Sequence, residues 1–287
     1  MSKLSPLAGT APRLQSSWDW RAAGNFIGGG SGAGLLVLGF AACLGGSLSI
    51  VAVALAGGTL IGLGLGCVWL EIGRPWRAIN VFFHPQTSWM TREGIVALAL
   101  YVAGGGVVLL DAPRLLGPMA LIACGFVYCQ GRILTAAKGI PAWRAKLTLP
   151  LILATAATEG AGLVLILAAL TGTAISWLGE GLLVLLAIRY VVWRSYLARL
   201  KAPAAAMAAA RGLHLPLALV GHLLPAVLVA VGALPLAGLL AVIGGWGLKY
   251  ILITRMALTQ GFSLPMTPAR GRGAAGPGVR PGWGGLS

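Results

Sequence analysis

The sequence predicts an all-α integral membrane protein, a bundle of about eight transmembrane helices with both termini on the same side. Of its 287 residues, 58% are hydrophobic and only 9% are charged, and the mean hydropathy is +0.89. A soluble domain carries roughly 25% charged residues, so this composition could not cover a water-facing surface. The 44 glycines agree with a membrane protein, because small residues let helices pack closely in lipid.

Eight apolar runs are long enough, or nearly so, to cross about 30 Å of hydrocarbon as helices. They cover residues 26–44, 48–70, 94–110, 115–136, 147–170, 174–193, 214–233 and 235–253. The third run is the weakest, because Asp111 and Pro113 close it early. The chain therefore divides into an N-terminal interfacial segment (1–25), an eight-helix transmembrane domain (26–255) and a C-terminal tail (256–287).

The net charge of +15 indicates which way the bundle faces. In a soluble protein such an excess would suggest nucleic acid, but here we expect loop charge that faces anionic membrane lipid, with no nucleic-acid partner. With an even number of spans, every Lys and Arg except Arg114 falls on one side, with Arg189 and Lys249 counted in the sixth loop and the tail. The positive-inside rule then predicts a multi-pass protein of a bacterial or archaeal cytoplasmic (inner) membrane with cytoplasmic termini. A docking face for a partner subunit would produce the same asymmetry.

The four cysteines lie inside apolar runs and show neither metal-ligand spacing nor a disulfide framework. We expect them to be buried as small hydrophobic residues and predict no metal site. The glycine-rich run 28–34 in the first span indicates close packing, either of helices or of a flat ligand. It is not a phosphate loop, because no strand precedes it and no Lys follows it.

The second loop holds the densest group of polar residues. It begins with Glu71-Ile-Gly-Arg-Pro-Trp-Arg77 and continues from His84 to Ser88-Trp-Met-Thr-Arg-Glu93. Ser88 or Thr91 could cap the third helix, with Glu93 in its first turn. An ordinary interfacial loop of arginines and a helix cap would account for this pattern. Titratable carboxylate and imidazole groups beside fixed cations also indicate a pocket where protons meet a redox ligand.

This loop resembles the hallmark loop of the DMSO reductase anchor and polysulfide reductase (NrfD-like) membrane subunits, which have a similar eight-span layout. Two further stretches are similar to a narrower branch, the membrane subunit of phenylacetyl-CoA:acceptor oxidoreductases. They are Trp18-Asp-Trp-Arg-Ala-Ala-Gly-Asn-Phe26 and the segment from Lys249 to Pro265. Some members of the family have His at the position of Glu71, and a carboxylate there can also exchange a quinone proton.

The resemblance implies a membrane anchor and quinone-reactive subunit of an oxidoreductase complex. Its expected partners are an iron–sulfur electron-transfer subunit and a molybdopterin catalytic subunit, which carry those cofactors. The expected ligand is menaquinone or ubiquinone, without haem, because only His222 among the three histidines lies deep in a span.

Candidate site residues follow from both arguments. We predict Glu71 and His84 as the proton-handling pair. The predicted quinone contacts are Arg74, Arg77, Tyr128 and Asn25. Tyr128 could instead be an aromatic anchor at the membrane interface. The predicted docking residues for the partner are Trp20, Arg21, Trp89 and Arg92, since Trp and Arg are enriched at binding hot spots.

Two polar residues lie deep in the predicted spans. Glu159 is about 18 Å along its helix from Leu147, near mid-membrane, and His222 lies two turns beyond His214. A bare carboxylate is costly there, so we consider a proton path through Glu159 and His222 beside a structural, hydrogen-bonded role. The same residues would form the ion path of a secondary transporter, which predicts matching broken helices in the two halves. A structural anchor without a ligand is the third alternative.

Overall fold

The computed structural model describes residues 7–8, 11–46, 48–72, 75–261 and 279–280, and this part of the chain is almost entirely helical. The α-helices are α1 (Trp20–Leu44), α2 (Ile50–Trp69), α3 (Trp89–Leu109), α4 (Leu116–Ala136), α5 (Thr148–Leu170), α6 (Leu178–Arg199), α7 (Ala204–Ala218), α8 (Leu224–Ala230) and α9 (Leu234–Thr254). The shorter elements are the 3-10 helices η1 (Pro75–Phe82) and η2 (Pro113–Leu115), the π-helical turn η3 (Leu219–Leu223), and two-residue strands β1 (Leu7–Ala8) and β2 (Val279–Arg280).

Eight helical spans in the described residues are long and apolar enough to cross a membrane. The fourth is Pro113–Ala136, which joins η2 to α4, and the seventh is Ala204–Ala230, which joins α7, η3 and α8. The prediction of an all-α bundle of eight spans is confirmed. The chain is a multi-pass membrane protein.

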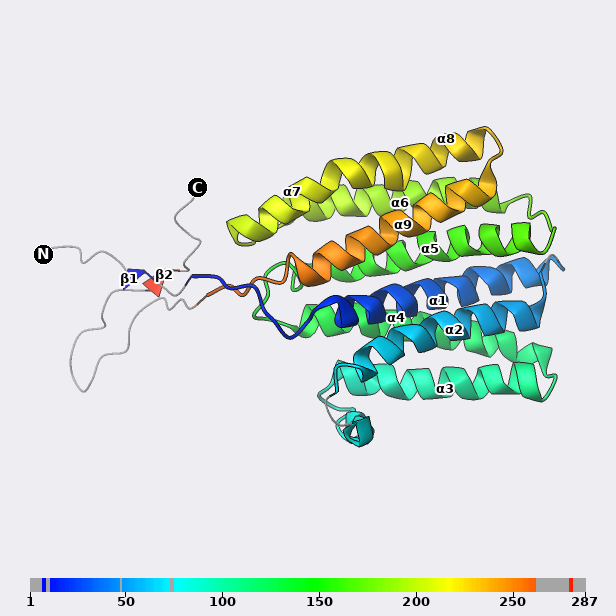
Figure 1. Cartoon of the computed structure of the whole chain (residues 1–287), viewed down its shortest axis with the longest axis horizontal. Helices are drawn as coiled ribbons and strands as arrows, with labels where there is room; N and C mark the ends of the chain where they lie inside the picture. Colours follow the sequence, from blue (N-terminus) through cyan, green and yellow to red (C-terminus); the bar gives the residue numbers. More distant parts are fainter. Residues whose placement is uncertain (1–6, 9–10, 47, 73–74, 262–278, 281–287) are drawn as a thin grey trace, which may run out of the picture.

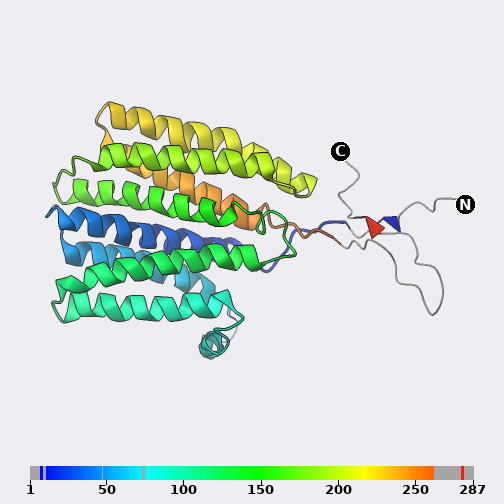
Figure 2. The same ribbon diagram turned by 180° about the vertical axis from the view of Figure 1, so that it is seen from behind.

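Helices α1 and α5 form the centre of the bundle. Helix α1 packs against α2, α4, α5 and α9, and α5 packs against α4, α6 and α9 as well. Helices α2 and α3 lie on one flank and α6, α7 and α8 on the other (Figures 1 and 2). The first four spans therefore form one half of the molecule, and α5 to α9 form the other.

Glycine brings the central helices into backbone contact. A methyl group on Gly34 of α1 would collide with the Ala156 carbonyl of α5, and one on Gly160 of α5 would collide with the Gly34 backbone. Gly162 of α5 and Gly238 of α9 face each other in the same way. Small residues serve this purpose in lipid, where the hydrophobic effect does not drive helices together. Of the two interpretations of the glycine-rich run, close packing of helices is the one observed.

The described segments before α1 and after α9 lie at the same end of the bundle. Leu7–Ala8 pairs with Val279–Arg280 as a parallel two-stranded sheet. Before α1 and after α9, the Gln15 N–H donates to the Ala257 carbonyl (3.1 Å) and the Thr259 N–H to the Arg13 carbonyl (2.8 Å). The expectation that both termini share one side is confirmed (Figure 1).

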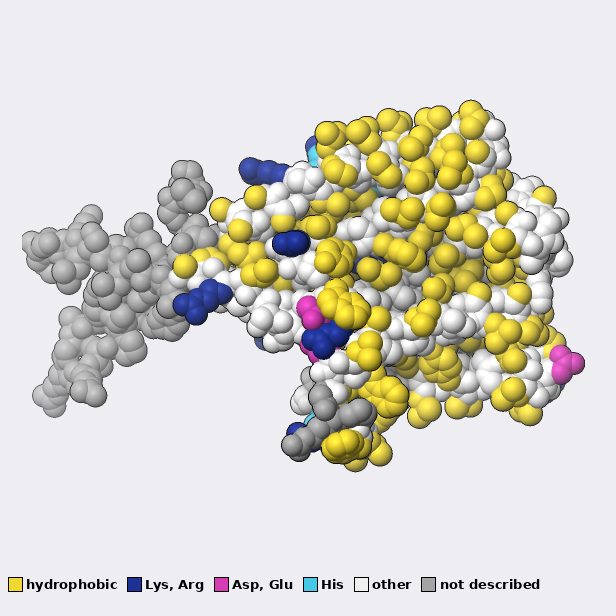
Figure 3. Space-filling model, in the orientation of Figure 1, with side chains coloured by type: hydrophobic (Ala, Val, Ile, Leu, Met, Phe, Trp, Pro, Cys, Tyr) yellow, Lys and Arg dark blue, Asp and Glu magenta, His cyan; other side chains and the backbone are white. Residues whose placement is uncertain are grey.

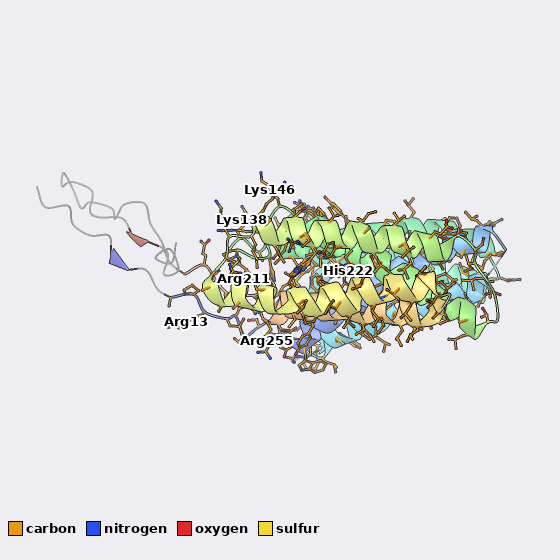
Figure 4. All side chains as sticks on the ribbon, turned by 90° about the horizontal axis from the view of Figure 1, so that it is seen from above. Arg13, Lys138, Lys146, Arg211, His222 and Arg255 are labelled. Atoms are coloured by element: carbon orange, nitrogen blue, oxygen red, sulfur yellow. The ribbon has the colours of Figure 1, made fainter. Side chains whose placement is uncertain are left out.

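The flank of the bundle is mainly apolar, whereas basic side chains gather at the terminal end (Figure 3). The basic residues at the terminal end include Arg13, Lys138, Lys146, Arg211 and Arg255 (Figure 4).

The loop assignment was wrong for two of the predicted basic residues. Arg189 and Lys249 are fully buried inside α6 and α9. Both lie within about two turns of the basic end of an apolar run, a position that predicts a loop charge, and the tertiary partners that keep them inside are distant in sequence.

Several boundaries also differ from the predicted runs. Helix α1 begins at Trp20 because the Asp19 carboxylate caps it, accepting the Arg21 N–H at 2.8 Å. The seventh span begins at Ala204, earlier than residue 214, since alanine extends the helix readily.

The expectation of four buried cysteines was wrong in part. Only Cys129 is buried, Cys43 and Cys67 are half-buried, and Cys124 is exposed on the bundle surface.

Candidate functional site

A cavity of about 720 Å³ lies in the half of the molecule formed by the first four spans. Its walls come from α1, α2, η1 and α3, from the segments just before α1 and just after α2, and from one residue of α4, and they are mostly apolar. Four polar or aromatic groups that bear on its chemistry are Trp18, Asn25, Glu71 and Glu93. This is where the second-loop motif predicts a pocket. A largely apolar concave site with a few convergent polar groups is the usual form of a small-molecule site.

Segment η1 forms part of the cavity wall at the terminal end. It runs across the direction of the spans (Figure 1), and its Ala78, Val81 and Phe82 line the cavity. Trp76 and Ile79 of the same segment are exposed, by 72% and 63%. An amphipathic segment that lies across the bundle end in this way is typical of one at the membrane–water interface.

Glu93 is the deepest carboxyl in the cavity. Its residue is 5% exposed, and its Oε1 accepts a hydrogen bond from Asn25 Nδ2 at 3.3 Å. Gln130 of α4 donates from Nε2 to the Asn25 carbonyl at 3.0 Å and so helps to position Asn25. Three helices that are far apart in sequence therefore converge on one titratable group at an apolar ligand-sized space.

Ser88 places Glu93 on its helix. The Ser88 hydroxyl accepts the Thr91 N–H at 3.2 Å, so the predicted cap is confirmed and α3 begins at Trp89. The interpretation of Glu93 as a first-turn residue favoured by the helix dipole was wrong. It lies one turn further in and faces the cavity, because the helix starts earlier than the apolar run.

Glu71 lines the same cavity at the mouth, just beyond the end of α2. Burial raises the pKa of this carboxyl above its ordinary value of 4.5, while the nearby Arg21 guanidinium lowers it and Asp19 raises it. Arg21 is held by an ion pair with Asp19 at 2.8 Å and donates to the Leu70 carbonyl at 3.3 Å. Arg21 thus positions the end of α2 beside Glu71, in addition to its predicted docking role.

The other second-loop candidates lie apart from this cavity. His84 and Arg77 are exposed and are not among the described residues that line it. Arg74 lies outside the described residues. The structure thus brings Glu71 and Asn25 to one site and leaves the second proposed proton-handling residue, His84, on the outer loop.

Trp89, Arg92 and Tyr128 form a separate cluster on the bundle surface. The Arg92 guanidinium lies 4.1 Å from the centre of the Trp89 ring, and that of Arg132 lies 4.9 Å from it. Tyr128 meets the same ring edge-on at 5.9 Å. Arg92 also donates to the Pro85 carbonyl at 2.7 Å and so fastens the second loop to α3. Tyr128, a predicted quinone contact, therefore lies with Trp89 and Arg92 and not among the residues that line the cavity. Trp20 is exposed by 56% at the start of α1.

A buried ion pair occupies the middle of the bundle. Lys249 Nζ of α9 contacts Glu159 Oε2 of α5 at 2.5 Å, and both side chains are fully buried. Ser31 of α1 donates to the same oxygen at 2.7 Å, and Trp246 donates to the Ser31 hydroxyl at 2.9 Å. Glu159 is thus deep and polar as predicted, but its partner is a lysine that the sequence suggested was outside.

His222, which is labelled in Figure 4, forms a second buried cluster with Arg189. Arg189 donates to His222 Nε2 at 3.2 Å, to the Ala241 carbonyl at 2.9 Å and to the Gly221 carbonyl at 2.5 Å. The π-helical turn η3 widens the backbone at this point, which makes a carbonyl available to a side chain. Glu159 and His222 do not contact each other, although Arg189 influences both electrostatically.

A second, wholly different cavity lies between α7 and α9. It has a volume of about 610 Å³ and an apolar lining in which Arg255 is the one charged residue among those described. It contains no carboxyl or imidazole, so it lacks a group that exchanges protons near neutral pH.

The sequence matches no protein-family model and no curated protein. Functional inference for this chain therefore rests on its motif, its cavity and its buried polar groups.

Glu93 is the main site residue that the predicted set lacked. Glu93 belongs to the Ser88-to-Glu93 motif, which indicates a site. A carboxyl near the start of a helix is also favoured by the helix dipole alone, so the motif did not single out Glu93 as a site residue. Gln130 and Lys249 were missed because the groups that they contact lie 105 and 90 residues away in the sequence.

Proposed function

We propose that the cavity binds a membrane quinone and that the chain is the membrane anchor and quinone-reactive subunit of a molybdopterin/iron–sulfur oxidoreductase complex. The observation that carries the proposal is the buried Glu93 carboxyl on the wall of an apolar cavity, where Asn25 donates to it and Gln130 in turn donates to the Asn25 carbonyl. Similarity of the second-loop motif to the anchor subunits supports the same conclusion.

The donor set fits a quinone. A quinone has a flat apolar ring, two carbonyl acceptors and an apolar tail, and its reduction consumes two protons as well as two electrons. The aromatic and aliphatic walls match the ring and tail. Asn25 and the carboxyl groups supply donors for the carbonyls and protons for the reaction. The electrons would come from or go to the iron–sulfur partner.

Each residue has a distinct task in this proposal. Glu93 exchanges a proton at one carbonyl, and Asn25 orients the Glu93 carboxyl. Glu71, at the mouth, exchanges the second proton with the aqueous side, and its raised pKa keeps it protonated to higher pH than an exposed carboxyl. Trp18 closes the cavity beside its packed neighbour Trp143, whose ring centre is 4.7 Å away.

The basic end is the proposed docking surface. It carries the Trp89, Arg92 and Arg132 cluster and the exposed Trp20, close to the cavity mouth. We propose that the termini and this surface face the cytoplasm of a bacterial or archaeal cell, where the partner subunits bind. Arginine suits such a surface, since its guanidinium pairs with carboxylates in bidentate geometry.

Substitution of the cavity carboxyls tests the proposal. In the purified complex, Glu93→Gln and Glu71→Gln should reduce quinone-linked turnover, while electron transfer to an artificial acceptor for the catalytic subunits continues. Glu180→Gln is the matched control, because that carboxyl is exposed at the start of α6, away from the cavity. Unchanged quinone turnover in both cavity variants would contradict the proposed site.

A secondary transporter is the second candidate, and the buried charges of Glu159, Lys249 and Arg189 favour it. It predicts a matching interruption in both halves. The seventh span has the π-turn η3, but the corresponding third span, α3, is a continuous helix. Solute uptake by vesicles that contain the purified chain alone would favour the transporter over the anchor.

A further inference from the structure

The surface cluster of Trp89, Arg92, Tyr128 and Arg132 places two guanidinium groups on one indole ring. The Arg92 guanidinium lies 4.1 Å from the centre of the Trp89 ring, and that of Arg132 lies 4.9 Å from it. The negative face of an aromatic ring attracts a cation, but two like charges beside one ring also repel each other. An anion bound next to the ring would offset this repulsion.

Both guanidinium groups have donors to spare within the described part of the chain. Arg92 donates from Nε to the Pro85 carbonyl at 2.7 Å and from Nη2 to the Gln86 carbonyl at 3.0 Å, so its position is fixed while Nη1 remains available. Arg132 Nε is buried and has no hydrogen-bond partner among the described residues. A buried donor without an acceptor is costly, and the fork of N–H groups on a guanidinium fits the oxygens of a phosphate.

No carboxylate of the chain neutralises the two arginines. The described residues include all six acidic residues, and neither Arg92 nor Arg132 forms an ion pair with any of them. The six are placed elsewhere: Asp19 and Glu159 in other ion pairs, Glu71 and Glu93 at the cavity, and Asp111 and Glu180 at the opposite end of the bundle. The counter-charge must therefore come from outside the chain.

An apolar stripe leads from this cluster along α4 toward the opposite end of the bundle. Tyr128, Cys124 and Leu121 precede Arg132 at spacings of four and three residues, which places them on one face of the helix. All three side chains are exposed on the bundle surface, Leu121 by 74%. Arg132 and Leu121 are about 16 Å apart along the helix axis, a length that matches one leaflet of a hydrocarbon core about 30 Å thick.

The cluster lies where the spans meet the terminal end. Trp89 is the first residue of α3, and Arg132 lies in the last two turns of α4. A soluble partner would cover the end of the bundle, whereas the stripe below the cluster lies on the flank, which hydrocarbon covers. A molecule with a phosphate at one end and an apolar chain at the other complements both parts.

We infer that Arg92 and Arg132 bind the phosphate of an anionic phospholipid beside the Trp89 ring, and that an acyl chain of this lipid lies along the α4 stripe. Basic pockets between transmembrane helices bind anionic head groups in this way. A zwitterionic lipid fits less well, because its head group brings a cation toward two arginines. The site is separate from the quinone cavity and does not depend on the proposed function. It borders the proposed docking surface on the side of the flank and does not replace it.

Lipid titration of the purified full chain tests the inference. The chain is stripped of lipid in a neutral detergent, and native mass spectrometry measures the binding of phosphatidylglycerol and of phosphatidylcholine with the same acyl chains. The native protein should bind phosphatidylglycerol more tightly. Inorganic phosphate at the same concentration should leave the lipid bound, because it lacks the acyl chain.

Two variants locate the site. Arg132→Gln removes one guanidinium, so phosphatidylglycerol affinity should fall by about tenfold, the loss expected for a hydrogen bond to a charged group. Its affinity for phosphatidylcholine should stay at the native level, which shows that the variant is folded. Arg211→Gln is the matched control and should bind both lipids as the native protein does. Arg211 is an exposed arginine of α7 that also lies at the terminal end (Figure 4).

Equal affinity of the native protein for the two lipids would overturn the inference, and so would full phosphatidylglycerol binding in Arg132→Gln. Displacement of the lipid by inorganic phosphate would reassign the cluster to a free anion. If Arg132→Gln keeps its lipid but no longer captures the iron–sulfur subunit, the cluster is a protein-docking site and not a lipid site.

Discussion

Substitution of Gly160 tests the packing at the centre of the bundle. An added methyl group on Gly160 would overlap the Gly34 carbonyl group of α1 and would lie 2.7 Å from the Gly34 Cα. Non-bonded carbons prefer about 3.5–4.0 Å, so α1 and α5 must move apart by at least roughly 1 Å. The obstacle is backbone, which cannot rotate aside, and overpacking of this kind costs up to about 3 kcal/mol. The gain in helix propensity from Gly to Ala returns about 1 kcal/mol, so we expect a net loss of about 2 kcal/mol.

Gly105→Ala in α3 is the matched control, since nothing lies within 4 Å of the position that its new methyl group would take. It should gain up to about 1 kcal/mol from helix propensity alone. The two variants should therefore differ by about 3 kcal/mol in the free energy of unfolding. Equilibrium unfolding of the purified protein in graded mixtures of mild and denaturing detergent measures that difference. Equal stability of the two variants would refute the close contact of α1 with α5.

Three further predictions concern the cavity mouth and the terminal end. Because the pKa of Glu71 is raised above 4.5, its protonated form persists to higher pH, and quinone affinity should fall as pH rises through that pKa. Binding titrations by tryptophan fluorescence should show this pH dependence in the native protein but not in Glu71→Gln, and an unaltered dependence in the variant would count against the role of Glu71. A reporter that is active only in the periplasm, fused after Ser287, should give no signal, and strong activity would reverse the orientation. Crosslinkers at Trp20 and Arg77 should capture the iron–sulfur subunit while one at Arg114 should not, and capture at Arg114 alone would place the docking surface at the other end.

Most of the fold could be predicted from the sequence because span length and apolar composition are local properties. Each run needs only its own residues to show that it can cross the hydrocarbon. The helix starts at Trp20 and Ala204 were missed, since a polar cap and an alanine-rich extension carry little hydropathy signal.

The buried charges could not be predicted in the same way. Lys249 and Arg189 lie near the basic ends of their runs, where lysine and arginine ordinarily reach the interface. What keeps them inside is a carboxylate on α5 and a set of carbonyls on η3 and α9, and no local pattern reports such partners.

The candidate site was predictable in part for the same reason. A cavity lies beside the motif, between the first helices, and Glu71 and Asn25 line it. The motif alone could not distinguish the buried Glu93 from the exposed His84, because that distinction depends on the way α3 rotates against α1 and α4.

The most direct measurement of the central claim is the position at which a photoreactive quinone analogue attaches to the protein. Peptide mapping after illumination should find the label on the cavity segments of α2, η1 and α3, between Gly62 and Tyr101. An excess of unlabelled quinone should remove it, and Ala97→Trp, which fills a buried part of the cavity wall, should do the same. A label found only in the cavity between α7 and α9, or one that excess quinone does not displace, would contradict the proposed quinone site.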